Sequence, residues 1–226
     1  MKENQRQWLL AICSFLTAGL ILSAVILQYA YTKGSGIRSG GTGMFRMFTN
    51  DGNLFSALAA LSCGIYSAYC AVRNKSMDSR VIYSLRLMSA VSETVIFLIV
   101  VAVLMPMGMN MLLSGYSLFV LHAAAPFVTV ISFALLDPRP KKIGKAGFLW
   151  GALPVFLYGL IVLILCLAKV WTGNLIPYPF FRVYDNPVWL TVAAMAGIIA
   201  VTLLLSFGLD RIRAGRKAKG QETEKP

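Results

Sequence analysis

Four polar side chains, in a chain that is otherwise mostly apolar, are of the types that ester chemistry requires. His122 is the only histidine, and an imidazole suits general-base catalysis near neutral pH. Thr49 carries a hydroxyl that becomes a useful nucleophile once a base removes its proton. The amide of Asn53 could donate to an oxyanion, and the carboxyl of Glu93 could orient the imidazole. Each of the four also has a purely structural explanation.

The sequence around His122 predicts an irregular helix. Pro126 follows four residues later and lacks the N–H that the His122 carbonyl would normally accept. We expect a kink there, with the free carbonyl bonded to water or to a side chain. Residues 123–125 are alanines, which keep the neighbourhood small. His122 is therefore either a general base with access to water or a packing residue bonded to a neighbouring helix.

Glu93 lies near the centre of another predicted apolar helix. Ser89 precedes it by one turn and Arg86 by two turns. Seven residues span about 10 Å along a helix, so Arg86 shares a similar face without touching Glu93. A carboxyl buried without a partner would be protonated. Glu93 could orient His122, carry a proton, or remain a neutral group bonded between helices.

Thr49 and Asn53 begin a face of small and polar residues. Such a face commonly holds membrane helices together, which is the structural explanation for it. The alternative is that Thr49 and Asn53 face a cavity, while Asn50 and Asp51 form an interfacial turn. The face continues at helical spacing through Ser56, Ala60, Cys63 and Ser67.

A Pro-Tyr-Pro segment at 177–179 lies in a later loop. Tyrosines near the ends of membrane spans typically form an interfacial belt, which is the interpretation that physical chemistry favours here. A rigid segment of this kind could instead cap a cavity.

The composition shows which elements must position these residues. The chain has 226 residues, of which 58% are hydrophobic and 13% are charged, whereas soluble domains carry about 25% charged residues. We therefore predict an all-α integral membrane protein built as a bundle of six transmembrane helices. Residues 1–209 form this domain, 210–226 form a basic cytoplasmic tail, and the first helix is a retained signal anchor. The predicted spans are 8–30, 50–72, 81–105, 112–136, 147–169 and 187–209.

The distribution of the basic residues predicts the orientation. The formal net charge is +12. Six spans place 16 of the 21 Lys and Arg residues on the side of the two termini and 5 on the other side. The positive-inside rule then puts both termini in the cytoplasm of a multi-pass cell-membrane protein. No folded basic module is present, so we expect a bilayer around the chain and no nucleic-acid partner.

The cysteines give no sign of a metal or redox site. All four fall within predicted spans, and none has the spacing of a metal site or a redox pair. We interpret them as small packing residues and predict neither a metal nor a cofactor. They are Cys13, Cys63, Cys70 and Cys166.

Three short motifs resemble those of a known family. They are FTNDGN at 48–53, LHAAAP at 121–126 and PYPF at 177–180. Their order resembles that of the androgen-induced-gene and androgen-dependent TFPI-regulating membrane proteins, and more closely that of their bacterial six-span relatives. The resemblance follows the spans over nearly the whole chain. Gly52 departs from it, since the bacterial pattern usually has serine at that position.

The resemblance implies a function and two roles. Animal members of the family are threonine hydrolases that cleave fatty acid esters of hydroxy fatty acids within the membrane. Thr49 matches the nucleophile and His122 the base, with a lipid or fatty-acyl ester as substrate. The alternative is a non-enzymatic lipid-binding protein or small transporter, in which Glu93 and His122 form a polar site. The oligomeric state stays open.

Counting residues along straight helices argues against direct contact between Thr49 and His122. Thr49 lies 24 residues from Arg73, and His122 lies 15 residues from Asp137, where the two helices end at the cytoplasmic side. The difference corresponds to about 13 Å in depth. Glu93 lies nearer the level of His122, so counting favours a Glu93–His122 pair while the resemblance favours Thr49–His122.

Overall fold

The fold is an α-helical bundle with six helices that are long and apolar enough to cross a membrane. The computed structural model describes residues 3–33, 41–106, 115–140 and 143–222, and these residues form helices and turns without a strand. The predicted fold class is thereby confirmed, and the chain is a multi-pass membrane protein. The candidate spans are Glu3–Thr32, Phe48–Val72, Arg80–Leu104, Tyr116–Leu136, Ala146–Leu167 and Val188–Ala214.

Two of the spans change helix type along their length. The third consists of α3 (Arg80–Ile99) and a π-helical turn, η2 (Val100–Leu104). The fourth consists of α4 (Tyr116–Phe119), a π-helical turn η3 (Val120–Ala124), and α5 (Ala125–Leu136). The other elements are α1 (Glu3–Thr32), η1 (Gly41–Arg46), α2 (Phe48–Val72), η4 (Lys145–Ala152), α6 (Leu153–Leu167), η5 (Gly173–Leu175), η6 (Pro179–Phe181) and α7 (Val188–Glu222).

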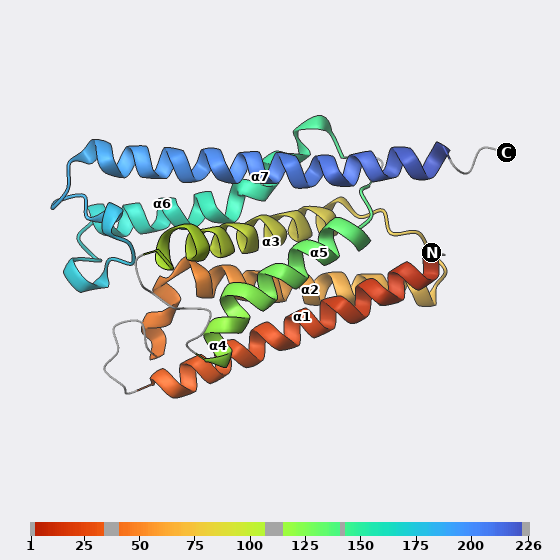
Figure 1. The fold of residues 1–226 in the computed structure, drawn as a ribbon, viewed down its shortest axis with the longest axis horizontal. Helices are drawn as coiled ribbons and strands as arrows, with labels where there is room; N and C mark the ends of the chain where they lie inside the picture. Colours follow the sequence, from red (N-terminus) through yellow and green to blue (C-terminus); the bar gives the residue numbers. More distant parts are fainter. Residues whose placement is uncertain (1–2, 34–40, 107–114, 141–142, 223–226) are drawn as a thin grey trace.

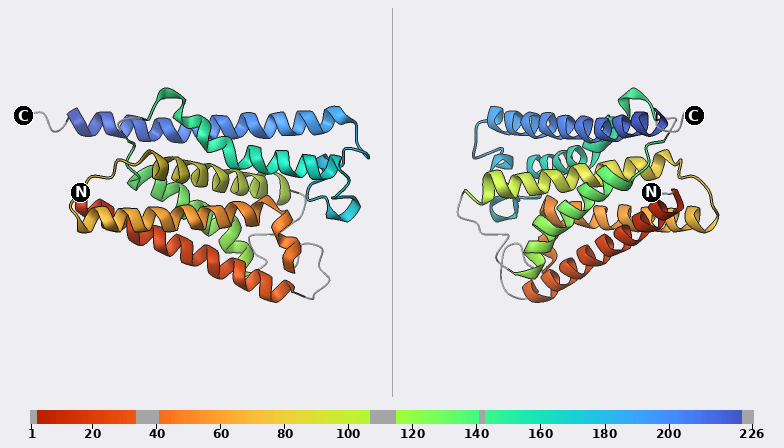
Figure 2. Two further views of the ribbon diagram at one scale, coloured as in Figure 1. Left: turned by 180° about the vertical axis from the view of Figure 1, so that it is seen from behind. Right: turned by 45° about the vertical axis from the view of Figure 1, so that its right-hand side comes forward.

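Helices α1, α2, α3 and α5 pack against one another, and α6 and α7 lie along one side of this group (Figure 1). The start of α1 and the end of α7 lie at one end of the bundle, which we call the terminal end (Figure 2). The opposite end, where α1 finishes and α2 begins, is called the loop end. The span α4–η3–α5 runs obliquely from the loop end to the terminal end.

Close contacts at glycines bring neighbouring helices together. A β-carbon at Gly64 would lie 3.1 Å from the ring of Phe15, where α2 meets α1. A β-carbon at Gly52 would lie 3.1 Å from Cδ1 of Ile96, which sets the register between α2 and α3. At Gly151 a β-carbon would overlap the hydroxyl of Ser206, so the backbone of η4 lies directly against the Ser206 side chain of α7. Small residues allow this close approach in membrane bundles, where van der Waals packing drives association.

The last helix extends beyond its predicted end. The span predicted to finish at 209 continues in α7 to Glu222, through much of the segment predicted as a tail. Asp210 and Arg213 are buried on this continuation. Of the most apolar 18-residue stretch of α7, only 11% is buried in the bundle. Most of this helix therefore exposes its side chains to the surrounding lipid.

Candidate functional site

His122 lies in the π-helical turn η3, and its ring is fixed by a local hydrogen bond. Nδ1 lies 2.8 Å from the carbonyl oxygen of Leu118, one turn earlier. A carbonyl can only accept, so Nδ1 carries the hydrogen and the neutral ring keeps its lone pair on Nε2. The side chain is 6% exposed. This tautomer is the one that a general base acting through Nε2 requires.

Asn53 connects α2 to this turn. Its Nδ2 donates to the carbonyl oxygens of Thr49 at 2.7 Å and of Leu121 at 3.0 Å. In a π-helical register the carbonyl of Leu121 faces residue 126, and Pro126 has no N–H to offer. The predicted side-chain partner for a free carbonyl is present, but it serves Leu121 rather than His122. The π-helical register shifts the unpaired carbonyl back by one residue.

Asn53 also determines how Thr49 lies relative to His122. Because Asn53 is at the level of Leu121, Thr49 stands one turn nearer the loop end. The axial offset between Thr49 and His122 is then about 7.5 Å, smaller than the 13 Å that straight helices predict. The oblique course of α4–η3–α5 accounts for the difference (Figure 1). No hydrogen bond joins the two side chains in the described part of the chain.

An aromatic cluster covers the loop end of α2. The hydroxyl of Tyr178 accepts from the backbone N–H of Phe48 at 3.2 Å, and the hydroxyl of Tyr158 donates to the Arg46 carbonyl. The rings of Phe48 and Tyr158 lie 5.1 Å apart, and those of Tyr178 and Phe180 are stacked at 5.6 Å. Burial raises the pKa of Tyr178 to about 12, so its hydroxyl stays protonated. The Pro-Tyr-Pro segment therefore caps the bundle beside Thr49 rather than forming only a lipid belt.

Asn50 and Asp51 belong to the first turn of α2 and not to a separate interfacial turn. The Nδ2 of Asn50 donates to the Met44 carbonyl at 2.9 Å, which ties η1 to α2. Asp51 supplies the negative charge that stabilises a helix N-terminus. Thr49 lies in the same turn and is half-buried.

Glu93 is fully buried, and no hydrogen bond connects it to His122. Both carboxyl oxygens lack a hydrogen-bond partner within the described residues. The Ser56 hydroxyl of α2 interacts with this carboxyl without reaching hydrogen-bond geometry. The register between α3 and α5 places Ala125 opposite Glu93, because Ser132 bonds to Arg86 seven residues down each helix. Glu93 thus lies nearer the terminal end than His122, and its carboxyl faces Ser56 on α2.

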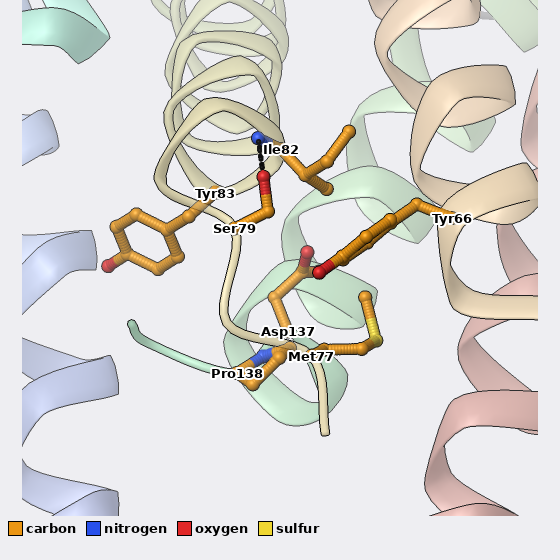
Figure 3. Close-up of a pocket in the computed structure, with 7 residues that line it drawn as sticks. All are labelled: Tyr66, Met77, Ser79, Ile82, Tyr83, Asp137 and Pro138. Carbon is orange, nitrogen blue, oxygen red and sulfur yellow. Dashed lines mark hydrogen bonds between the residues drawn. The ribbon is translucent and has the colours of Figure 1, made fainter. Parts of the chain in front are cut away.

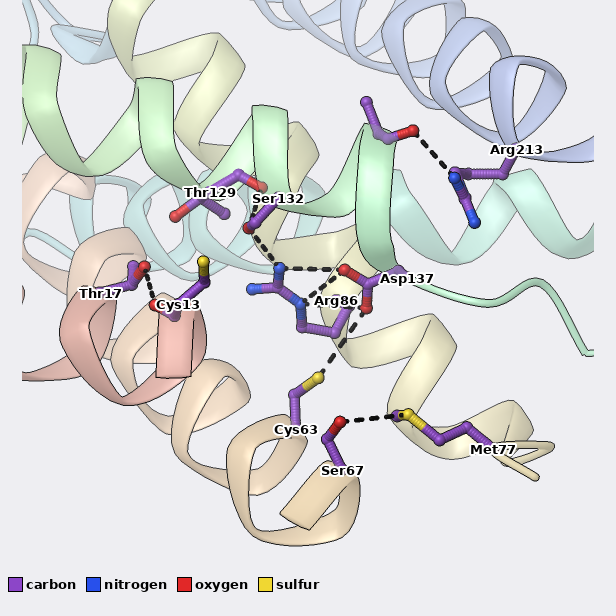
Figure 4. A network of polar contacts seen from close by, with 11 residues as sticks. Cys13, Thr17, Cys63, Ser67, Met77, Arg86, Thr129, Ser132, Asp137 and Arg213 are labelled. Carbon is purple, nitrogen blue, oxygen red and sulfur yellow. Dashed lines mark hydrogen bonds and ion pairs between the residues drawn. The ribbon is translucent and has the colours of Figure 1, made fainter. Parts of the chain in front are cut away.

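A buried ion pair that the sequence analysis did not predict lies nearer the terminal end (Figure 4). Nη2 of Arg86 is 3.1 Å from Oδ2 of Asp137, and Nε approaches both carboxylate oxygens at 3.2 and 3.3 Å. Nη2 also donates to Ser132 at 2.8 Å. Nη1 has no hydrogen-bond partner among the described residues. The positive-inside count places Arg86 among the charges outside the membrane, but it lies inside the bundle and is neutralised by Asp137.

A second ion pair joins α7 to the other helices. Arg139 donates from Nε and a terminal nitrogen to the two oxygens of Asp210, both at 3.0 Å. Tyr83 donates to the same carboxylate at 2.7 Å. The pKa of Arg139 is raised because Asp210 accepts these hydrogen bonds. The segment 137–139 therefore binds α3 through Asp137 and α7 through Arg139.

A small pocket opens beside Asp137 at the terminal end (Figure 3). Its volume is about 10 Å³, which is the size of a single water site. It offers no room for an acyl chain, so it is separate from the candidate ester site. The lining residues are Tyr66, Met77, Ser79, Ile82, Tyr83, Asp137 and Pro138.

The four candidate residues do not form one contiguous cluster. Asn53 brings Thr49 and His122 towards the same level, whereas Glu93 faces a different helix. The described residues hold no group of three His, Cys, Asp or Glu side chains that could bind a metal. A pairing of Arg86 with Asp137 could have been suspected from the sequence, because Arg86 lies near the start of the span 81–105, Asp137 follows the span 112–136 at the same predicted end, and their charges are opposite.

The comparisons add no relative. No protein family, no curated protein and no solved structure matches the chain. Only the residues themselves therefore point to a function.

Proposed function

We propose that this protein is a membrane-embedded hydrolase of lipid esters, of the fatty acid ester of hydroxy fatty acid type. Thr49 is the nucleophile and His122 is the base. The observation that carries the proposal is the bond from His122 Nδ1 to the Leu118 carbonyl, which leaves Nε2 as the basic nitrogen. The bond from Asn53 to Leu121 supports it, because it brings Thr49 within about one and a half turns of His122 along the bundle.

The reaction would use two steps. Nε2 of His122, acting through one bridging water, takes the hydroxyl proton of Thr49, whose oxygen attacks the ester carbonyl, and the alcohol leaves with that proton. Water, deprotonated by the same imidazole, then releases the fatty acid and restores Thr49. Thr49 lies at the N-terminus of α2, where the helix dipole favours a negative oxygen. Asn53 already uses its amide nitrogen twice, so it would act as a positioning residue that holds η3 against α2.

The bundle would lie in the cell membrane with both termini in the cytoplasm. The support is the excess of basic residues on the side of the termini, 15 against 5 once the buried Arg86 is left out. The ester site would then lie in the outer half of the bilayer, beneath the cap formed by Tyr178. Acyl chains would extend between the helices into lipid.

The test is turnover of a hydroxy-fatty-acid ester by purified protein in lipid nanodiscs. Thr49→Ala and His122→Ala should each lower kcat by about 100-fold or more, since nucleophile and base act as a unit. Thr94→Ala is the matched control, because its hydroxyl only bonds to the Ala90 carbonyl of its own helix. Turnover that survives in both site variants would sink the assignment.

A second candidate is a non-enzymatic lipid-binding protein or small transporter with a polar site in the bundle. It is favoured by the buried carboxyl of Glu93, which has no partner in the described chain. A fluorophosphonate probe separates the two candidates. Covalent labelling of Thr49 supports the hydrolase, and its absence in folded protein supports binding or transport.

A further inference from the structure

The bundle contains a row of buried polar atoms without partners. Such atoms are rare in protein interiors, and each calls for a water, an ion or a functional explanation. On α3 the row runs along one stripe, from Arg86 through Ser89 to Glu93, at spacings of three and four residues. This stripe covers about 10 Å of the helix.

Neighbouring helices extend the row at matching levels. The Arg86–Ser132 bond and the core cluster that holds both Leu87 and Phe133 align α3 with α5, so Thr129 lies near the level of Ser89. The close approach of Gly52 to Ile96 sets the register against α2, which places Ser56 opposite Ser92 and Glu93. The side chains of Thr129, Ser56, Ser89, Ser92 and Glu93 are all 0% exposed, and their polar atoms have no partner in the described chain.

The terminal end of the row reaches the pocket beside Asp137. Asp137 lines that pocket and binds Arg86 from the other side. In Figure 4 the unpaired nitrogen of Arg86 points away from Asp137, toward the side where Thr129, Thr17 and Cys13 lie. The pocket, the guanidinium and the hydroxyl groups between it and Glu93 therefore form a sequence of polar sites that ends at Glu93.

The balance of buried charge identifies the ligand that Glu93 would take. Arg86 and Asp137 neutralise each other, so an ionised Glu93 would leave one uncompensated negative charge inside the membrane. An isolated charge at that depth is costly, and binding one monovalent cation removes it. Serine hydroxyls can donate as well as accept, which suits a proton on the carboxyl and water beside it.

We propose that Glu93 is a reversible proton-binding site that exchanges with the solution at the terminal end through the row of Ser89, Thr129 and Arg86. The site holds one proton as a neutral carboxylic acid and releases it as the row hydrates. This role is independent of ester hydrolysis, because it involves neither Thr49 nor a substrate.

Other titratable groups lie on the elements around Glu93, and the test must separate them from it. No acid or histidine forms a hydrogen bond with Glu93 in the described chain. Titratable and charged groups on α3 and on the elements around it include Arg80, Tyr83 and Arg86 on α3, Asp51, Cys63, Tyr66, Tyr69 and Cys70 on α2, Cys13 on α1, His122 on η3, Tyr116 on α4, Asp137 and Arg139 after α5, Tyr158 and Cys166 on α6, and Asp210, Arg211 and Arg213 on α7.

Infrared spectroscopy of protein in nanodiscs detects the protonated carboxyl directly. Carbon-13 labelling of glutamate assigns the band, because Glu93 is the only glutamate within a long apolar stretch. We expect a protonated band at neutral pH that shifts with the label, disappears in Glu93→Gln and disappears at alkaline pH. A wild-type protein without this band would overturn the proposal, and the label assigns the band even if the variant fails to fold.

Transfer into D₂O tests the route. The band should shift quickly in wild type and more slowly in Thr129→Val, which removes the hydroxyl but keeps the shape. Thr94→Val is the control, since Thr94 neighbours Glu93 but bonds to its own helix at 2.7 Å, and exchange should stay fast. A band that never shifts, or equal rates in Thr129→Val and wild type, would refute the route. Loss of the band on adding sodium at constant pH would show a sodium site instead.

Discussion

Arg86 shows how strongly one residue can depend on its tertiary partners. A lone guanidinium inside a membrane bundle is costly, and here Asp137 and Ser132 offset that cost. The pair is fully enclosed, with side-chain exposures of 0% and 2%. Arg86 lies on α3 and Asp137 directly follows α5, so the pair forms only when the two helices pack together.

We predict that breaking this pair destabilises the protein more than replacing it. Arg86→Met leaves Asp137 uncompensated and should lower the unfolding free energy by about 3–5 kcal/mol, while Arg86→Met with Asp137→Leu should recover most of the loss. Denaturant titration followed by circular dichroism measures both. Arg139→Met is the control, because the pair of Arg139 with Asp210 is partly exposed. Breaking it should lower the unfolding free energy by less than Arg86→Met does. Equal losses in the single and double variants would contradict the expectation.

At the scale of elements, the π-helical turn η3 depends both on its own sequence and on a side chain from another helix. Pro126 removes one backbone donor, and the π-helical register moves the unpaired carbonyl to Leu121. Asn53 on α2 then supplies the missing hydrogen bond. A helix irregularity, a proline and a buried asparagine on another helix thus form one unit beside His122.

A double-mutant cycle tests that unit. Asn53→Ala should destabilise the wild-type protein, but less so in a Pro126→Ala background, because that substitution restores a backbone N–H for the free carbonyl. The expected coupling is about 0.5–3 kcal/mol, measured by denaturant titration. Asn50→Ala is the control, because Asn50 bonds to the Met44 carbonyl. Its loss of unfolding free energy should be the same with and without Pro126→Ala. Additive effects of Asn53→Ala and Pro126→Ala would rule out the shared role.

At the scale of the whole molecule, four packed helices hold the polar groups while α6 and α7 stand to one side. The Arg139–Asp210 pair and the contact between Gly151 and Ser206 attach α7. The start of α1 and the end of α7 lie at one end of the bundle, as six spans require (Figure 1). The described contacts of α7 with the other helices lie along one side of it. The hydrophobic surface on its other side therefore faces lipid.

Orientation in the membrane gives a prediction at the same scale. A fluorescent protein fused to the C-terminus should fluoresce in the cytoplasm, and alkaline phosphatase inserted at 171–187 should be active outside. Replacing the basic residues of 211–219 and adding lysines at 171–187 should weaken this bias. An active phosphatase at the C-terminus of the unaltered chain would reverse the proposed orientation.

Much of the architecture was predictable from the sequence. Six apolar stretches predict six helices because a bilayer core accepts backbone only with its hydrogen bonds satisfied. Helical spacing predicts the face from Asn53 to Ser67, and its residues are buried. Pro126 predicts an irregularity because the missing N–H is a local property of the chain.

Other features were decided only by tertiary structure. The Arg86–Asp137 pair, the partner of the Leu121 carbonyl and the smaller offset between Thr49 and His122 all depend on helix tilt and register. Those quantities arise from packing between helices far apart in sequence, such as the contact of Gly52 with Ile96. The sequence alone determined which polar residues lie inside the membrane, and the packing determined which of them meet, because depth follows from local hydropathy whereas contact requires a second helix.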